Sequence, residues 1–217
     1  MVDRFESDDA ADYEAARERM VKAVSRHVDS ERVLEALEAV PRHEFVPEIR
    51  RDGAYADRPL PIGDGQTISA PHMVAIMADE LALEPGENVL EIGTGCGYHA
   101  AVTAELVGAD HVYSVEYSEE LAERARETLA ELGYGDVSIR VGDGREGWVD
   151  HAPYDAVYVT CAATGFPEPV VDQTRPGGRL LAPIGTAFQT LVKATKCEDG
   201  SLERSEHGGV QFVRMRG

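Results

Sequence analysis

Cysteine is scarce in this chain of 217 residues, and long apolar runs are absent. The three cysteines, Cys96, Cys161 and Cys197, are odd in number, widely spaced and never paired as C-x-x-C. That pattern argues against a disulfide framework or a zinc site and is typical of a reducing compartment. No apolar run approaches the roughly 18 residues of a membrane span, and residues 1–30 are too charged for a secretory signal peptide. We therefore expect a soluble, cytoplasmic protein with no membrane contact.

Positive charge is also in short supply, since 40 acidic residues face 21 basic ones and the formal net charge is −19. This balance predicts an acidic surface and argues against a nucleic-acid partner, which would need clustered lysine and arginine. The G-x-S-x-G elbow, the H-E-x-x-H helix and the P-loop are all missing. The seven histidines show no metal-ligand spacing, so no metal site is expected.

What the chain does contain is a stretch from Val89 to Tyr98 that joins a short apolar strand, three alternating glycines and the start of a helix. Glycines favour such a turn because they tolerate positive φ and let a ligand approach the backbone. A dinucleotide fingerprint, G-x-G-x-x-G/A, would need a small residue at position 98, where this chain has tyrosine. The third glycine comes one residue early, at Gly97.

The acidic residue in this stretch also disfavours a dinucleotide. Glu91 lies at the end of the predicted strand, where its charge would repel a pyrophosphate and attract a ligand that carries a sulfonium and an ammonium group. The pattern E-x-G-x-G-x-G resembles motif I of the S-adenosylmethionine-dependent methyltransferases. Taken alone, the stretch also fits a strand–turn–helix unit whose glycines serve packing only.

From residue 88 onward the sequence alternates strand and helix. Strands are expected over 88–93, 111–115, 137–141, 154–160 and 179–184, with helices over 97–107 and 119–132. This alternation predicts a Rossmann-like α/β fold: a doubly wound, mostly parallel sheet with helices on both faces. Segments 187–196 and 208–215 are expected to complete the sheet as an antiparallel edge.

The N-terminal part is predicted to be a helical extension. A mostly charged helix is expected over residues 8–29 with Ser7 as its N-cap, and Ser30 is expected to cap a second helix. We divide the chain into residues 1–85, with the N-terminal helices and the active-site loop, and residues 86–217, the cofactor-binding core. The two parts are expected to form one compact unit and a monomer.

Residues 51–71 are rich in proline and glycine and are predicted to be irregular. A loop of this length inside a compact domain is usually functional. It leads into an apolar helix over 72–83, and Ser69 lies in the N-cap position of that helix. Ser69 could therefore be a helix cap only, or it could face the same cleft as the glycine turn.

Three acidic residues are predicted at consecutive strand ends, namely Glu91, Glu116 and Asp143. Ligands of such sheets bind beyond the carboxyl ends of the strands. Glu116 follows Gly97 by 19 residues, a position where an acid can accept both ribose hydroxyls of an adenosine, in NAD as well as in S-adenosylmethionine. Asp143 can accept from an adenine amino group. Each acid alone is more often a solvated loop end, but together with the glycine turn they indicate an adenosine-containing ligand.

From about residue 38 to the end, the chain resembles the protein-L-isoaspartate O-methyltransferase family. The matching segments are VPRHEFVP (40–47), DRPLPIG (57–63), GQTISAPHM (65–73), LEIGTGCGY (90–98), GDGREGW (142–148), APYDA (152–156) and RPGGRL (175–180). The Gln-Thr-Ile-Ser segment is the specific one, because motif I is shared by the whole superfamily. The chain departs from the family pattern at Asp64, at Cys96 and at Val213-Arg214-Met215, where Val-Pro-Leu is usual.

The resemblance implies a protein carboxyl O-methyltransferase that transfers a methyl group from S-adenosylmethionine to the α-carboxylate of L-isoaspartyl residues in damaged proteins. S-adenosylhomocysteine is the product, and the methyl ester initiates repair. The resemblance places the active-site serine at Ser69. Thr160, at the end of its predicted strand, is expected to form a wall of the same substrate site. It places the cofactor against Gln66, Thr67, Ile68, Ser69, Glu91, Gly93, Thr94, Gly95, Gly97, Glu116, Gly142, Asp143 and Gly144.

The expected chemistry agrees with the missing catalytic motifs. A carboxylate is ionised at pH 7, with a reference pKa near ~4, so the transfer needs no general base. Displacement at a sulfonium methyl needs alignment and exclusion of water, so we expect Ser69 to orient the carboxylate rather than to attack. The alternatives are a methyltransferase for another carboxylate or a small molecule, a non-catalytic domain, and a nicotinamide-dependent oxidoreductase, which Glu91 and Tyr98 disfavour.

Overall fold

The computed structural model describes residues 5–217, with side chains described from residue 12 onward. Its α-helices are α1 (Phe5–Val24), α2 (Glu31–Ala39), α3 (Pro71–Leu81), α4 (Tyr98–Val107), α5 (Glu119–Glu131) and α6 (Glu168–Asp172). Its strands are β1 (Leu60–Gly63), β2 (Gln66–Ile68), β3 (Val89–Ile92), β4 (Val112–Glu116), β5 (Ser138–Val141), β6 (Tyr154–Val159), β7 (Thr174–Gly185), β8 (Gln189–Lys196) and β9 (Leu202–Val210). Short 3-10 turns are η1 (Arg42–Phe45), η2 (Glu48–Gly53), η3 (Ala109–His111), η4 (Gly144–Glu146) and η5 (Val149–His151).

The main sheet has seven strands in the order β5-β4-β3-β6-β7-β8-β9. The first five are parallel, and β8 and β9 complete the sheet as an antiparallel edge. The predicted doubly wound, mostly parallel sheet is confirmed. The chain runs outward from β3 to β5 and then returns to place β6 on the other side of β3, which makes the β3–β6 boundary the topological switch point.

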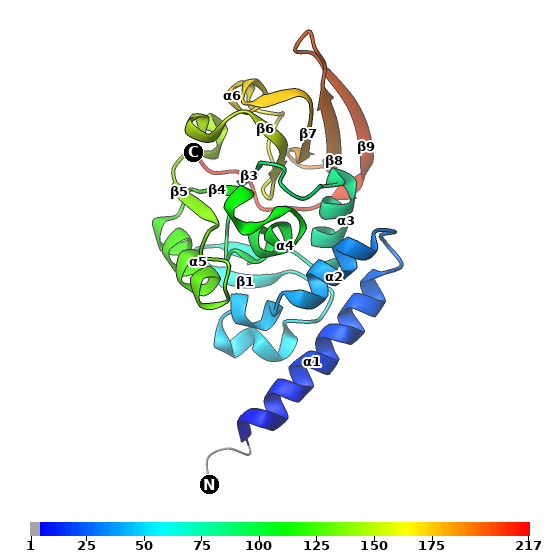
Figure 1. Cartoon of the computed structure of the whole chain (residues 1–217), viewed down its shortest axis with the longest axis vertical. Helices are drawn as coiled ribbons and strands as arrows, with labels where there is room; N and C mark the ends of the chain where they lie inside the picture. The colour runs from blue at the N-terminus through cyan, green and yellow to red at the C-terminus, as the bar shows by residue number, and fades with distance from the viewer. Residues whose placement is uncertain (1–4) are drawn as a thin grey trace.

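Each face of the sheet has its own hydrophobic core, because strand side chains alternate between faces. The larger core joins Val89 of β3 to helices α1 to α5, and it includes residues from both predicted parts of the chain. The smaller core joins Leu90 and Ile92 to Val170 of α6. Figure 1 shows α4 and α5 over one face of the sheet and α1 extending beyond the rest of the molecule. Helices therefore lie on both faces.

The N-terminal segments differ from the predicted bounds. Helix α1 begins at Phe5, so Ser7 lies inside it, and it ends at Val24, five residues before the predicted end at residue 29. Ser30 caps α2 as predicted, since its hydroxyl accepts the Val33 N–H at 3.4 Å. Helix α3 has Ala70 as its N-cap residue and no side-chain cap, so Ser69 lies one residue too early to cap it.

Two further segments were assigned wrongly from the sequence. Residues 51–71 are not irregular throughout, because β1 and β2 form an antiparallel hairpin within them. The last strand ends at Val210, and residues 211–217 leave the sheet. This tail crosses to the end of β6, where Arg214 forms an isolated parallel bridge with Ala162. Both the hairpin and the tail reach the carboxyl ends of the parallel strands.

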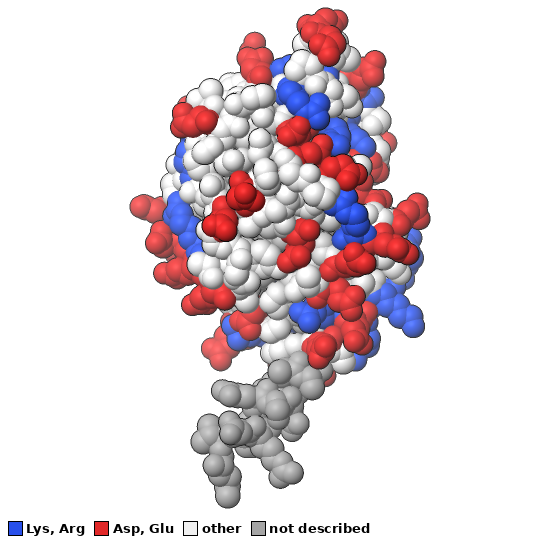
Figure 2. All heavy atoms as spheres, in the orientation of Figure 1, with Lys and Arg blue, Asp and Glu red and all other residues white. Residues whose placement is uncertain are grey.

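Figure 2 shows acidic side chains both around the rim and across the middle of one face, with basic side chains among them. Some charged side chains of the protein are paired, as in the contact of Arg179 with Glu87 and the 3.6 Å contact of Lys193 with Glu80. In the part of the chain that the structure describes, no helix is both long enough and apolar enough to cross a membrane. Within the same residues, no cluster of three or more His, Cys, Asp or Glu side chains could hold a metal ion.

The side chain of Glu91 is wholly buried, which corrects the expectation that it faces a ligand. It falls on the same face of β3 as Val89 and packs into the helical layer, because alternate residues of a strand share a face. Its carboxyl group accepts a hydrogen bond from the Ser114 hydroxyl at 2.5 Å. Ser114 Oγ in turn lies 2.6 Å from Thr94 Oγ1. Loss of hydration on burial raises the pKa of Glu91 to about 8. Glu91 is therefore linked through Ser114 to Thr94 of the glycine turn and helps to hold the turn in place.

This burial predicts a pH-dependent stability. Folding raises the pKa of Glu91 from 4.5 to about 8. Between pH 4.5 and about pH 8, the folded state therefore keeps a proton on Glu91 that the unfolded state has lost. The wild-type protein therefore loses free energy of unfolding as the pH rises through that window, and the loss is constant above it. Removing the carboxyl in Glu91→Gln removes this loss. We expect the free energy of unfolding of Glu91→Gln, relative to wild type, to rise between about pH 5 and pH 8, as measured by urea titration.

The matched control is Glu127→Gln, which changes an exposed residue of α5. Its difference from wild type should stay flat over the same pH range. A pH-independent difference for Glu91→Gln would contradict a buried carboxyl group that keeps its proton.

Candidate active site

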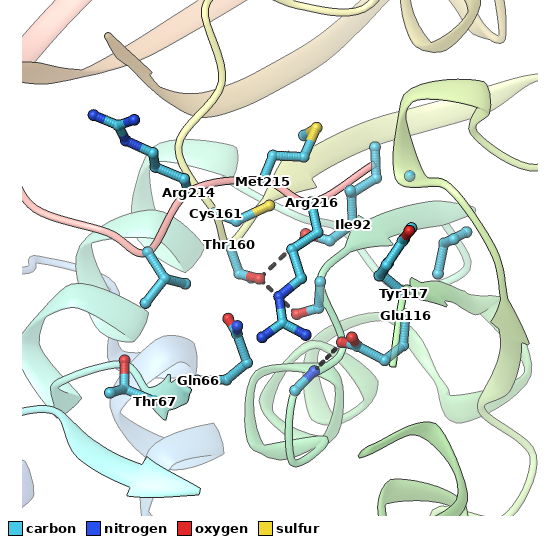
Figure 3. A pocket seen from close by; sticks show the side chains of 15 residues that line it. Gln66, Thr67, Ile92, Glu116, Tyr117, Thr160, Cys161, Arg214, Met215 and Arg216 are labelled. Carbon is cyan, nitrogen blue, oxygen red and sulfur yellow. Dashed lines mark hydrogen bonds between the residues drawn. The ribbon is translucent and has the colours of Figure 1, made fainter. Parts of the chain in front are cut away.

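A cavity lies at the carboxyl ends of β3, β4 and β6 (Figure 3). Ligands of open α/β sheets bind in the crevice at this place, at a topological switch point. The predicted site residues that line it are Gln66, Thr67, Gly93, Gly95, Glu116, Gly144 and Thr160. Residues of the β1–β2 hairpin therefore meet the strand ends, although they are distant in sequence.

The first glycine of the turn is packed directly against the end of β6. Gly93 has a φ of +98°, and a Cβ atom at this position would lie 2.3 Å from Thr160 Oγ1. The Thr160 hydroxyl donates a hydrogen bond to the Gly93 carbonyl at 2.5 Å. Glycine is therefore required here both by the backbone conformation and by the close approach of Thr160.

The amides of the turn are satisfied within the protein. Gly95 N–H donates to Glu116 Oε2 at 2.8 Å, and Gly93 N–H donates to the Val115 carbonyl at 2.8 Å. A pyrophosphate would need such donors to be free, and it would be repelled by the Glu116 carboxylate. The second Glu116 oxygen accepts from Ser118 N–H at 2.9 Å. Since each carboxylate oxygen has a further lone pair, Glu116 can still accept ribose hydroxyls.

Ser69 is held in place by a buried arginine. The Arg42 Nη2 donates to the Ser69 carbonyl at 2.6 Å, and its Nε donates to the Ala54 carbonyl at 2.8 Å. The guanidinium lies 4.7 Å from the ring centre of Tyr98, the first residue of α4. Arg42 is fully buried, and loss of hydration lowers its pKa. The arginine thus joins the Ser69 segment to the helix that follows the glycine turn.

Ser69 itself lines a second space, an open groove beside the cavity. Its hydroxyl is half-buried and has no hydrogen-bond partner among the residues whose side chains are described. The far side of the groove is formed by the β7–β8 loop, including the exposed Phe188. The cavity and the groove share four wall residues: Thr67, Thr160, Val213 and Arg214.

Several predicted site residues do not line the cavity. They are Ile68, Ser69, Glu91, Thr94, Gly97, Gly142 and Asp143, of which Ser69 lines the groove instead. Ile68 is buried in the core, and Thr94 is bonded to Ser114. Gly97 packs behind the turn, where a Cβ would lie 3.1 Å from Leu129. The Asp143 carboxylate pairs with Arg145 at 2.6 Å, and this pairing lowers the pKa of Asp143.

The structure also adds lining residues that the sequence did not indicate, namely Tyr117, Cys161 and the tail over 213–216. Tyr117 directly follows Glu116, the acidic residue predicted to bind the ribose hydroxyls. Its place in the cavity wall could therefore have been predicted from the sequence. Arg216 reaches across the cavity and pairs with Asp64 at 2.6 Å. The sequence marked Asp64 as unusual, but a partner so distant in the chain could not be deduced from it.

Comparison with known sequences agrees with this geometry. A family model described as Protein-L-isoaspartate(D-aspartate) O-methyltransferase (PCMT) matches residues 15–217. Protein-L-isoaspartate O-methyltransferase 2 of Archaeoglobus fulgidus is 52% identical over 208 residues, which cover 95% of each chain. A protein-L-isoaspartate O-methyltransferase of Methanothrix thermoacetophila is 53% identical over 202 residues, which cover 93% of this chain and 95% of the relative.

Solved structures show the same fold. One described as a protein-L-isoaspartate O-methyltransferase has a TM-score of 0.85 and 31% identity, covering 93% of this chain and 66% of that longer one. A Plasmodium falciparum structure, described as a putative protein-L-isoaspartate O-methyltransferase in complex with S-adenosyl-L-homocysteine, has a TM-score of 0.81 and 24% identity. It covers 92% of this chain and 98% of its own. On the family match and the two relatives of more than half identity, this chain belongs to the protein-L-isoaspartate(D-aspartate) O-methyltransferase family.

Proposed function

We propose that this chain transfers a methyl group from S-adenosylmethionine to the α-carboxylate of L-isoaspartyl residues in damaged proteins, which initiates their repair. The observation that carries this proposal is the wall shared by the cavity and the groove, which includes Thr67 and Thr160. A donor in the cavity and an acceptor in the groove would meet at this wall. Family membership supports the choice of donor and acceptor.

The residues of the cavity fit S-adenosylmethionine, which supplies an electrophilic methyl group on a sulfonium. Glu116 would accept the ribose hydroxyls, and the turn at Gly93 and Gly95 would lie along the ligand. At Gly144 a Cβ would come within 2.2 Å of Ile92 Cγ2, so glycine brings the end of β5 close to the end of β3. Residues that do not line the cavity, such as Glu91 and Thr94, would support the turn instead of contacting the ligand.

On the acceptor side, Ser69 would donate its free hydroxyl to the incoming carboxylate. Arg42 fixes the Ser69 carbonyl and so limits where that hydroxyl can lie. No general base is needed, because the acceptor is already ionised at neutral pH. Residues 1–85 would then supply the serine side of the acceptor site, and residues 86–217 most of the donor site. A cytoplasmic location and a monomeric state remain predictions.

The activity is tested with labelled S-adenosylmethionine and two matched peptides, one with L-isoaspartate and one with L-aspartate. We expect base-labile label in the isoaspartyl peptide only. In L-isoaspartate the chain continues through the side-chain carboxyl group, so only this peptide has a free α-carboxylate at the tested residue. Label in neither peptide would contradict the proposal. Label transferred to an unrelated small carboxylate, and not to either peptide, would favour the alternative of a small-molecule methyltransferase.

A second prediction concerns Ser69. A hydrogen bond to a charged group contributes about 1.5–3 kcal/mol, so Ser69→Ala should lower kcat by about 10- to 100-fold. Its affinity for S-adenosylmethionine, measured by calorimetry, should change little, since Ser69 lines the groove and not the cavity. Ser205→Ala on β9, an exposed serine outside both spaces, serves as the control. Unchanged turnover of Ser69→Ala would remove the serine from the mechanism.

A further inference from the structure

We propose that Arg214 makes this enzyme prefer damaged segments that carry an acidic side chain next to the isoaspartyl residue. The inference rests on the proposed function and adds a selectivity to it. The feature behind it is a cationic side chain on the groove side of the tail, in a protein that is otherwise strongly acidic.

The surface on which a damaged segment would lie is lined by no acidic side chain of residues 12–217, where side chains are described. None of the aspartates and glutamates in that range lines the groove. None of them lines the adjoining cleft either, which is formed by the other side of the tail with Ala163, Phe166 and Gly185. A net charge of −19 would repel an acidic segment elsewhere on the molecule. The groove is therefore a place where a carboxylate can approach without local repulsion.

Arg214 is the arginine common to the groove and the cleft. Two other arginines line the cleft, but Arg145 is paired with Asp143 and Arg216 is paired with Asp64. Arg214 is exposed and has no acidic partner among residues 12–217, where side chains are described. Its guanidinium is thus free to pair with a carboxylate of another molecule.

The backbone that carries Arg214 is fixed on both sides. Ala162 N–H donates to the Val213 carbonyl at 2.7 Å, and Met215 N–H donates to the Ala162 carbonyl at 2.9 Å. These bonds tie the tail to the segment that follows β6 and Thr160. An arginine on a fixed backbone loses less conformational freedom on binding than one on a mobile loop.

The direction of the side chain identifies which carboxylate it meets. In Figure 3 the Arg214 side chain runs away from Thr160 and the cavity, whereas Arg216 points toward Gln66. The methyl-accepting carboxylate has to lie near Thr160 of the shared wall and near Ser69 of the groove, so the Arg214 guanidinium would meet a neighbouring residue of the substrate. A planar guanidinium pairs with a carboxylate through two parallel hydrogen bonds. Glutamate and aspartate are therefore the favoured neighbours.

The test uses peptides that differ only in the residues flanking one L-isoaspartate, which are Glu, Gln or Lys. For the wild-type enzyme at low salt we expect kcat/KM to be about fivefold higher for Glu than for Gln, and lower again for Lys. The Glu-to-Gln ratio should fall toward one in about 1 M KCl, because salt screens exposed charges. A purely structural role of Arg214 would not produce this salt-dependent selectivity.

Variants assign the selectivity to the side chain. In Arg214→Gln the Glu-to-Gln ratio should approach one, and Arg214→Lys should retain part of the preference. Arg50→Gln removes an exposed arginine of η2 that lines neither the groove nor the cleft, and it should keep the wild-type ratio.

The outcomes separate this inference from the proposed function. Methylation of the isoaspartyl peptides with equal kcat/KM for all flanking residues overturns the role of Arg214 and leaves the methyltransferase activity intact. An unchanged Glu-to-Gln ratio in Arg214→Gln also overturns it. Failure to methylate any isoaspartyl peptide overturns the proposed function and the inference together.

Discussion

The packing of Gly93 against Thr160 fixes how the two sides of the active site are related. Strands β3 and β6 are neighbours at the switch point, and their register pairs Ile92 with Val159. The residues that follow, Gly93 and Thr160, must therefore meet, and they are joined by a 2.5 Å hydrogen bond. One belongs to the turn of the cavity, and the other lines both the cavity and the groove. The donor and acceptor positions are thus set by adjacent strands of one sheet.

Buried polar groups hold the surrounding backbone in position. Below the turn, Glu91 is bonded to Ser114, and its raised pKa of about 8 means that it is mostly uncharged at neutral pH. Glu116 bonds the Gly95 amide, and Arg42 bonds the Ser69 carbonyl. These bonds make the turn and the serine segment parts of the scaffold.

The fold could be predicted from the sequence because alternating strand and helix patterns leave few topologies to consider. Apolar runs such as Val89–Ile92 and the small residues of the glycine turn are local signals. The placement of Ser69 in a groove was anticipated from the family resemblance, but its role as a helix cap was ruled out by the structure, where Ala70 takes that position. The hairpin of β1 and β2 was missed because its prolines and glycines also fit an irregular loop.

Other features depended on contacts that no local pattern contains. Glu91 was expected at the ligand, but the alternation of β3 turns it toward the helices. The pairing of Asp64 with Arg216 joins the turn between β1 and β2 to the C-terminal tail. The position of the tail over the cavity follows from the bridge between Arg214 and Ala162, far apart in the chain. Such contacts are set by the assembled fold and could be seen only in the structure.

The most direct test of this account is the affinity of Gly93→Ala for S-adenosylmethionine, measured by calorimetry against Gly86→Ala. Both glycines have positive φ, but a Cβ at Gly86 would meet nothing within 4 Å, whereas one at Gly93 would lie 2.3 Å from Thr160 Oγ1. We expect Gly93→Ala to weaken binding by at least about tenfold, or roughly 1.4 kcal/mol, and Gly86→Ala to bind as the wild type does. Equal affinities for the two variants would contradict the claim that S-adenosylmethionine lies against the contact of Gly93 with Thr160.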